Sequence, residues 1–305
     1  MGLYEDLLQN HDAKLIAGGA AQNTARGAQV AVPSPLYLCP IPIGPVLSHY
    51  NPSATQWPLE AIAEAATFRS LILHSPPQYI LPPSSVLYIG CVGSDQYASH
   101  LRSACEQAGL RVEYQLSPSN SPTGRCGVII TGQNRSMCTH LAAANDYKLS
   151  HLQSPEIWKL VQQAKVYYVG GYHLTVCPDA AMALAKEAAK ENKIYVLSLS
   201  APFIPQFFKA QVDETAPYWD YVIGNETEAR SWAGVHDECK EKEDVKAIAR
   251  HLAELPKENR ERKRVVVVTQ GTDETVLAVQ GEEGVRTFSV REIATQEICD
   301  TNGAG

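Results

Sequence analysis

The sequence has 305 residues, of which 45% are hydrophobic and 19% are charged, and its formal net charge is −7. These values describe a globular chain with enough apolar material for one large domain. The acidic balance argues against a broad surface for nucleic acid, although a small anionic ligand would need only a few local donors. There is no apolar run of about 18 residues and no signal-peptide pattern, so we expect a cytoplasmic protein, with the nucleus as a second compartment and no membrane partner.

The first motif along the chain is AGGAAQN (17–23), which places two glycines and an asparagine where a strand would turn into a helix. Glycines at such a junction let the backbone approach a ligand closely. Asn23 could bond a polar edge of that ligand. A glycine turn with a helix-capping residue explains the same letters, so the motif alone does not separate a binding site from a turn.

The segment 30–78 differs in composition from the rest of the chain. It holds nine of the 19 prolines, and its charged side chains are Glu60, Glu64 and Arg69. Proline at this density interrupts helices and strand ladders alike. A loop of this length is unusual inside a compact domain, and we expect the segment to be disordered.

The next part of the chain predicts a strand at 86–95, followed by a helix at 96–109. Two later stretches, 111–116 and 124–132, alternate more strongly between apolar and polar residues and have no helix between them. Alternation of this kind is typical of half-buried strands. We therefore expect a small antiparallel piece that forms a flap over the main sheet.

The second half alternates between short apolar runs and helical patterns. Runs rich in β-branched residues predict buried strands, and residues with helical spacing of apolar side chains predict helices between them. Strands buried on both faces that alternate with helices indicate a mostly parallel sheet with helices on both sides. The predicted strands are 165–171, 193–200, 221–225 and 264–271, and the predicted helices are 178–192 and 243–255.

Two short motifs follow predicted strands of this half. In GNETEA (224–229), Asn225 and Glu228 lie one helical turn apart, so their amide and carboxylate could orient water around a metal; a helix capping box is the alternative. TQG (269–271) ends the valine-rich strand, and open α/β sheets bind ligands at the carboxyl ends of their strands. A simple glycine turn explains TQG equally well.

The last motif is DTNGAG (300–305), in which small residues let several backbone N–H groups converge. Such groups, at the start of a helix, would form an anion hole from Gly303, Ala304 and Gly305. An anion hole can stabilise the charge that develops on a transferring phosphoryl group. The sequence has no GxxxxGK[ST] and no GxGxxG motif, which argues against a P-loop or a dinucleotide-binding Rossmann fold.

Taken together and in this order, the motifs closely resemble the ribokinase-like (PfkB) family of carbohydrate and nucleoside kinases. The resemblance covers 1–29 and 79–305. It implies a three-layer α/β/α sandwich with a small β lid, expected here in truncated form. We expect one incomplete domain over 1–305, with the lid at about 1–17 plus 110–142. The motifs that carry the resemblance are AGGAAQN, PTGRCGVIITGQNRSM, LAAAN, GGYHLTV, LSLSAPFIPQFF, GNETEA, VVTQG and DTNGAG.

Within that family, LSAPFIPQF and TGQNRSM are typical of members that phosphorylate adenosine. The resemblance implies a monomer that uses Mg²⁺ to transfer the γ-phosphate of ATP to the adenosine 5′-hydroxyl, giving AMP in purine salvage. By motif, Gly18, Gly19 and Asn23 would hold the ribose, and Arg135 would approach the phosphates. Met137, Leu141, Tyr172 and Phe203 would wall the adenine pocket, although Tyr172 and Phe203 could instead be core residues. Asn225 and Glu228 would organise Mg²⁺ through water, and Thr269 and Gly271 would lie beside ATP.

The sequence departs from the family pattern at three places. No strand with an acidic ribose motif precedes residue 17. Segment 30–78 has no family counterpart; it begins with Val30, whose codons all start with GT, and ends with Gln78, which CAG can encode. Our hypothesis is therefore an intron translated in frame, with a genuine disordered insertion as the alternative, and the cDNA sequence would decide.

The third departure concerns the general base. In the family, the residue after DTNGAG is an aspartate that acts on the 5′-hydroxyl, and Gly305 is the last residue of this sequence. No catalytic base is therefore assigned, and we expect this chain to be inactive, since loss of a general base costs about 10²–10⁴-fold. The alternatives are a nucleotide-binding fragment without activity and a sugar kinase of the same family.

Overall fold

The computed structural model describes residues 16–29, 83–131 and 134–291. These residues fall into two compact units, which are treated separately below. Unit 1 comprises 16–29, 83–131 and 134–147, and unit 2 comprises 148–291. The predicted anion hole (Gly303, Ala304 and Gly305), the proline-rich segment 30–78 and the first 15 residues of the predicted lid lie outside the described residues.

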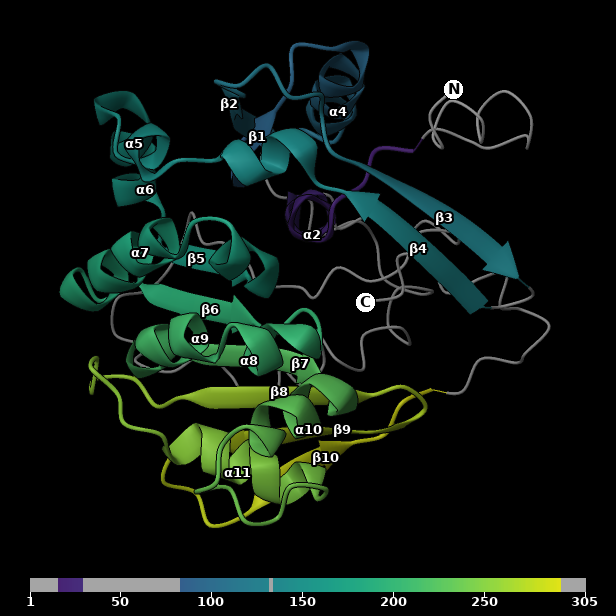
Figure 1. The fold of residues 1–305 in the computed structure, drawn as a ribbon. Helices are drawn as coiled ribbons and strands as arrows, with labels where there is room; N and C mark the ends of the chain where they lie inside the picture. Colours follow the sequence, from purple (N-terminus) through teal and green to yellow (C-terminus); the bar gives the residue numbers. More distant parts are fainter. Residues whose placement is uncertain (1–15, 30–82, 132–133, 292–305) are drawn as a thin grey trace. The chain divides into compact units, whose positions relative to one another are not determined.

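Unit 2 is built on a six-stranded sheet with the order β10-β9-β8-β7-β6-β5 (Figure 1). The first four strands along the chain pair in parallel, and β9 and β10 add an antiparallel edge. The four predicted strands of this half are therefore confirmed. The strands are β5 (Val166–Gly170), β6 (Ile194–Ser198), β7 (Tyr221–Asn225), β8 (Val265–Gln270), β9 (Asp273–Val279) and β10 (Val285–Phe288).

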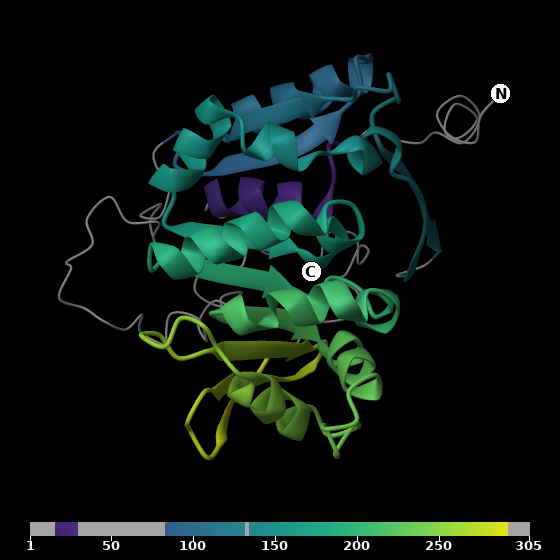
Figure 2. The ribbon, with the colours of Figure 1, turned by 60° about the vertical axis from the view of Figure 1, so that its left-hand side comes forward.

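Helices fill the connections between the parallel strands. Because consecutive strands are neighbours in the sheet and such crossovers are right-handed, these helices lie on one face of it, as Figure 1 and Figure 2 show. These connecting helices therefore form one helical layer, and they do not supply the second layer that the resemblance implies. The helices are α7 (Pro178–Lys190), α8 (Phe203–Phe207), α9 (Lys209–Thr215), α10 (Glu226–Gly234) and α11 (Val245–Glu254); α5 (Leu149–Leu152) and α6 (Pro155–Gln163) precede β5.

The core of unit 2 shows that β6, β8 and β9 are buried on both faces, whereas β7 alternates between buried and half-buried residues. Val265 and Val267 of β8 cluster with Leu277 and Val279 of β9. The alternate β8 residues, Val266 and Val268, point to the other face and are 1% and 2% exposed. Since successive side chains in a strand point to opposite faces, the run of four valines suits a strand covered on both sides.

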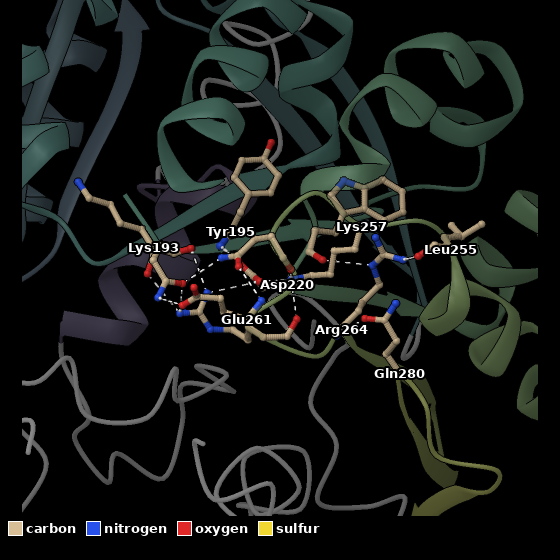
Figure 3. Close-up of polar contacts among 12 residues, drawn as sticks. Lys193, Tyr195, Asp220, Leu255, Lys257, Glu261, Arg264 and Gln280 are labelled. Atoms are coloured by element: carbon tan, nitrogen blue, oxygen red, sulfur yellow. Dashed lines mark hydrogen bonds and ion pairs between the residues drawn. The ribbon is translucent and has the colours of Figure 1, made fainter. Parts of the chain in front are cut away.

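At the amino ends of the parallel strands, a buried ion pair joins β7 to the loop before β8 (Figure 3). The Asp220 carboxylate accepts hydrogen bonds from Lys257 Nζ at 2.6 Å and from the Tyr195 backbone N–H at 2.8 Å. Lys257 Nζ also donates to the carbonyls of Asn259 and Arg262 at 2.7 and 2.8 Å. Burial lowers the pKa of Lys257, although Asp220 favours its charged form. All three ammonium protons thus have acceptors.

Arg264, the residue before β8, is completely buried in the same region. Its guanidinium donates to five backbone carbonyls, and burial lowers its pKa to about 10. The carbonyls of Leu252 and Leu255 lie at and just after the carboxyl end of α11, where helix carbonyls lack partners within the helix, so Arg264 satisfies polar groups that would otherwise be buried unpaired. The acceptors are Ala216, Trp219, Leu252, Leu255 and Pro256, at 2.6 to 3.2 Å.

Unit 1 contains a small parallel pair of strands. β1 (Leu87–Val92) pairs with β2 (Arg111–Leu116), and α4 (Gln96–Gln107) connects them. Cys105, Leu110 and Val112 form the buried centre, against which Tyr88 and Tyr114 pack. The helix α2 (Ala20–Gln29) belongs to the same unit.

The predicted antiparallel pairing of 111–116 with 124–132 is wrong. β3 (Arg125–Thr131) instead pairs with β4 (Asn134–His140), while β2 pairs in parallel with β1. Alternation indicates a half-buried strand and does not identify its partner. The helix between β1 and β2 supplies the crossover that a parallel pair requires. The short 3₁₀ helix η2 (Ala142–Asp146) follows the β3–β4 hairpin.

Candidate functional site

The carboxyl ends of the parallel strands carry most of the predicted site residues of unit 2. Tyr172 follows β5, Phe203 follows β6, Asn225 and Glu228 follow or end β7, and Thr269 lies at the end of β8. Figure 1 shows the parallel strands β5 to β8 side by side. Because parallel strands end at the same edge of a sheet, the residues at their carboxyl ends form one row. The structure therefore brings together positions that are almost 100 residues apart in the sequence.

Asn225 and Glu228 form a complete capping box at the start of α10. The Asn225 Oδ1 accepts from the Glu228 backbone N–H at 2.9 Å, and Glu228 Oε2 accepts from the Asn225 backbone N–H at 3.0 Å. The Asn225 Nδ2 also donates to Glu228 Oε1 at 3.2 Å. The helix capping box, which the sequence analysis left open as the alternative for this motif, is therefore present. It fixes both side chains at the edge where a ligand would lie, so it is compatible with a binding role.

The Glu228 carboxylate lies in a confined environment. It is 7% exposed, and burial raises its pKa, although the hydrogen bond from the Asn225 backbone opposes this rise. A Cβ on Gly224 would lie 3.0 Å from Glu228 Oε2, so glycine at 224 leaves the carboxylate its space. A carboxylate held in a partly desolvated position interacts more strongly with a nearby cation than one in water.

Thr269 lies beside Asn225, because these two residues are register partners of the parallel strands β7 and β8. Thr269 is exposed. Gly271 follows with a φ of 58°, a left-handed conformation that favours glycine and turns the chain into β9. The TQG motif is thus a turn, and that turn leaves an exposed hydroxyl next to the Asn225–Glu228 box.

Tyr172 and Phe203 form an aromatic pair at the other end of the row. Their ring centroids are 5.9 Å apart, with an angle of 59° between the ring planes. They are 40% and 39% exposed, respectively. Two large rings with this exposure are not core residues, so the core alternative for them is not supported. Paired exposed rings suit the flat face of a planar ligand.

Two residues that the sequence analysis did not single out hold this pair in place. Ser200 has a φ of 68°, unusual for a residue other than glycine. Its Oγ accepts a hydrogen bond from the Gly171 backbone N–H at 2.8 Å. A Cβ on Gly171 would lie 2.6 Å from the Leu199 carbonyl oxygen, so the two loops pack backbone to backbone. The glycine pair at 170–171 was the available signal for this close approach.

The predicted residues of unit 1 lie in two separate elements. Gly18 and Gly19 precede α2, and Gly19 has a φ of 102°. Asn23 is exposed and lies inside α2, so it is not the residue that caps it. Met137 in β4 and Leu141 just after it are 58% and 37% exposed. Arg135 lies in β4 as well, and its side chain is outside the described residues.

A magnesium site can be tested against the donor atoms. Within the described residues, no group of three histidine, cysteine, aspartate or glutamate side chains could hold a metal. The oxygens of Asn225 and Glu228 are engaged in the capping box. Mg²⁺ prefers oxygen ligands and keeps several of its waters, so this pair fits a role in which it binds the waters of the ion.

Comparison with known proteins identifies the family of this chain. The model of the pfkB family of carbohydrate kinases matches residues 79–305. The chain therefore belongs to the pfkB family of carbohydrate kinases.

Several relatives within the family are adenosine kinases, which confirms the resemblance found from the motifs. The chain is 49% identical over 230 residues to adenosine kinase of Schizosaccharomyces pombe, covering 75% of this chain and 66% of that protein. It is 39% identical over 304 residues to adenosine kinase of Schizophyllum commune, covering 99% of this chain and 74% of that protein.

Solved structures of adenosine kinases are also similar. One is Anopheles gambiae adenosine kinase in complex with P1,P4-di(adenosine-5) tetraphosphate, with a TM-score of 0.77 and 36% identity, covering 98% of this chain and 73% of that chain. Another is Schistosoma mansoni adenosine kinase in complex with 2-fluoroadenosine, with a TM-score of 0.76, 28% identity and the same coverage. These likenesses confirm the ribokinase-like α/β fold. Among the described residues, no helix combines the length and hydropathy needed to cross a membrane.

Proposed function

We propose that this chain carries the nucleoside and nucleotide sites of an adenosine kinase, which transfers the γ-phosphate of ATP to the adenosine 5′-hydroxyl and gives AMP in purine salvage. The observation that carries the proposal is the row of groups at the carboxyl edge of the sheet, with an exposed aromatic pair at one end and the Asn225–Glu228 box beside Thr269 at the other. The names of the relatives support it. A kinase of this class needs both an apolar platform for a base and polar groups for phosphates.

On the nucleoside side, the proposed contacts follow from side-chain chemistry. The rings of Tyr172 and Phe203 would contact the adenine, because exposed aromatic faces stack on bases. Met137 and Leu141 would add apolar contacts to the base, and Arg135 would approach the phosphates. Gly18, Gly19 and Asn23 would hold the ribose through backbone groups and an amide. The β3–β4 hairpin would serve as part of the lid.

On the phosphate side, Thr269 and Gly271 would lie beside ATP, and Asn225 and Glu228 would orient the waters of Mg²⁺. The ion, when bound, neutralises charge on the phosphates. The confined Glu228 carboxylate would hold those waters in one orientation, which is the contribution of this chain. The proposed anion hole of Gly303, Ala304 and Gly305 would stabilise the transferred group.

The test is a calorimetric titration of the chain with adenosine, with ribose, and with a non-hydrolysable ATP analogue in the presence of Mg²⁺. We expect binding of adenosine and of the analogue, and no competition from ribose. Phe203→Ala should weaken adenosine binding roughly ten-fold or more, since stacking on one ring contributes about 1–3 kcal/mol. Phe207→Ala is the matched control, because Phe207 is in the same helix and is 77% exposed.

Two results would contradict the proposal. Ribose that competes with adenosine on equal terms would favour a sugar kinase of the same family. If the Phe203 and Phe207 substitutions changed adenosine affinity equally, the Tyr172–Phe203 pair would not be part of the adenosine site. For assembly and location, we propose a monomer in the cytoplasm, with the nucleus as a second compartment; sedimentation and imaging of a tagged chain would test these points.

A further inference from the structure

The β3–β4 hairpin of unit 1 is attached through two short segments, here called its feet. The chain enters the hairpin through the entry foot, 121–124, and leaves it through the exit foot, 141–143. The hairpin itself carries large exposed apolar side chains: Ile129, Ile130 and Met137 are 57%, 48% and 58% exposed. The described residues of unit 1 therefore do not bury these side chains. The feet join the hairpin to the unit, together with Arg125 of β3, whose guanidinium lies 5.1 Å from the centroid of the Tyr97 ring in α4.

The entry foot is fixed by one buried residue, Thr123, which is 3% exposed. Its backbone N–H donates to Asp95 Oδ2 at 2.7 Å, and its hydroxyl donates to Asp95 Oδ1 at 2.7 Å. The same hydroxyl accepts from the Gly93 backbone N–H at 3.0 Å. Thr123 thus uses both its backbone donor and its side chain to attach the hairpin to the turn between β1 and α4.

Asp95 is held in a single orientation by its other contact. It is the N-cap of α4 and accepts from the Ala98 backbone N–H at 3.0 Å. Burial would raise the pKa of Asp95, but the hydrogen bonds from Thr123, Ala98 and Tyr97 together outweigh burial and lower it. Asp95 is therefore ionised at neutral pH, and its hydrogen bonds to Thr123 are charge-assisted.

Backbone contacts leave little freedom around this attachment. A Cβ on Gly93 would lie 2.6 Å from the Ser121 carbonyl oxygen and 2.7 Å from the Thr123 nitrogen. The two feet also touch each other: the Ala143 N–H donates to the Pro122 carbonyl at 3.0 Å, and a Cβ on Gly124 would lie 2.7 Å from the Leu141 carbonyl oxygen. A change at Thr123 is therefore transmitted to the exit foot, which includes Leu141.

We propose that Asp95 and Thr123 form a positioning pair that fixes the direction of the β3–β4 hairpin and thereby sets the affinity for the nucleoside. The pair acts through Met137 and Leu141, so neither Asp95 nor Thr123 needs to touch the substrate. The effect on affinity rests on the proposed function, because it requires that the hairpin contributes to the adenosine site. The attachment itself follows from the contacts within unit 1.

The experiment compares Thr123→Val with Thr123→Ser in the full chain. Valine has the shape of threonine and lacks the hydroxyl, whereas serine keeps it. Thr131→Val is the matched control, since Thr131 is exposed at the far end of β3, away from the feet. The first readout is hydrogen exchange at the amide of Ala143, which Thr123 does not contact directly. The second readout is the dissociation constant for adenosine compared with that for the Mg²⁺-bound ATP analogue.

We expect Thr123→Val to speed exchange at Ala143 and to weaken adenosine binding roughly ten-fold, because a buried N–H loses its acceptor and a charged acceptor loses a donor. Affinity for the ATP analogue should not change. Thr123→Ser should restore both readouts to near the wild-type values, Asp95→Asn should resemble Thr123→Val, and Thr131→Val should have no effect.

The two readouts distinguish failure of the positioning role from failure of the proposed adenosine-binding function. An unchanged rate of hydrogen exchange at Ala143 in Thr123→Val would contradict the claim that Thr123 fixes the hairpin, regardless of the adenosine affinity. Equal weakening of adenosine and of the ATP analogue would indicate general destabilisation and would overturn the positioning role. If the wild-type chain does not bind adenosine, the proposed function fails, and the exchange measurement still decides whether Thr123 fixes the hairpin.

Discussion

The two edges of the six-stranded sheet in unit 2 use polar groups in opposite ways. At the amino edge, the charges of Asp220, Lys257 and Arg264 are buried, and each has its hydrogen-bonding partners. At the carboxyl edge, Tyr172 and Phe203 are exposed, Ser200 has a left-handed backbone, and burial raises the pKa of Glu228. The charged groups at the first edge are buried with their partners, whereas the second edge exposes two aromatic rings and the Thr269 side chain.

Under the proposed function, this difference separates residues that stabilise the fold from residues that bind a ligand. Buried charges stabilise a fold only when their partners are in place, so the amino edge should tolerate little change. Backbone strain concentrates at functional sites, so we expect substitutions at the carboxyl edge to affect stability less and ligand binding more. The predictions below test that division, starting with the largest effect.

Asp220→Ala should give the largest loss of stability. It leaves the Lys257 ammonium buried without its ion-pair partner and removes the acceptor of the Tyr195 N–H. We expect the free energy of unfolding to fall by about 3–5 kcal/mol, as measured by urea denaturation. Glu191→Ala, which removes the exposed pair with Lys190, is the control and should cause no measurable change. A loss at Asp220 as small as in the control would contradict a stabilising amino edge.

Arg264→Lys should cost less, about 2–3 kcal/mol, because the charge is retained while the planar set of donors is lost. An ammonium has three protons and cannot serve the five carbonyls that the guanidinium contacts. Thermal or urea unfolding would measure the change. Lysine at 264 with wild-type stability would mean that water can replace the missing donors.

At the carboxyl edge, two substitutions of Ser200 should separate backbone strain from hydrogen bonding. Ser200→Ala keeps a side chain at a φ of 68° and removes the acceptor of the Gly171 N–H, whereas Ser200→Gly removes both the acceptor and the strain. We expect alanine to be less stable than glycine by about 1 kcal/mol. Both should weaken adenosine binding several-fold, because Tyr172 follows Gly171. Equal stability of the two variants would show that the left-handed backbone carries no cost.

Glu228→Gln should have the smallest effect on stability, and that effect should depend on pH. A carboxylate whose folded pKa is raised above its ordinary value of 4.5 contributes stability below that value, and the contribution is lost as pH rises through the folded pKa. Wild type should therefore lose stability relative to Glu228→Gln as pH rises above 4.5, as measured by urea denaturation. Binding of the Mg²⁺-bound ATP analogue should weaken in the variant. A stability difference that does not change over this range would contradict the raised pKa.

Much of unit 2 could be predicted from the sequence, because its strands are continuous apolar runs and its helices have regular spacing. The run of four valines before Thr269 needs burial on both faces, and the structure provides it. Pairing in unit 1 could not be predicted in the same way. The sequence of β4, NRSMCTH, has little β-branched character, so the true partner of β3 was not recognised.

The candidate site carries clearer sequence signals than the buried network at the opposite edge of the sheet. Glycines, aromatic residues and the Asn225–Glu228 spacing are local signals that lie within a few residues of one another. Asp220, Lys257 and Arg264 are separated by up to 44 residues and meet only because the fold joins their loops. Ser200 was missed because an ordinary serine gives no sign that its backbone is left-handed.

The strand order of unit 2 has a consequence for how the chain is made. The order of β5 to β10 across the sheet is also their order along the polypeptide, so each strand from β6 onward hydrogen-bonds to the strand synthesised just before it. Contacts that are near in sequence form quickly, and domains emerging from the ribosome fold from the amino end. A nascent chain that has been extended through β8 therefore already contains both partners of the Asn225–Thr269 pairing and both partners of the Asp220–Lys257 ion pair.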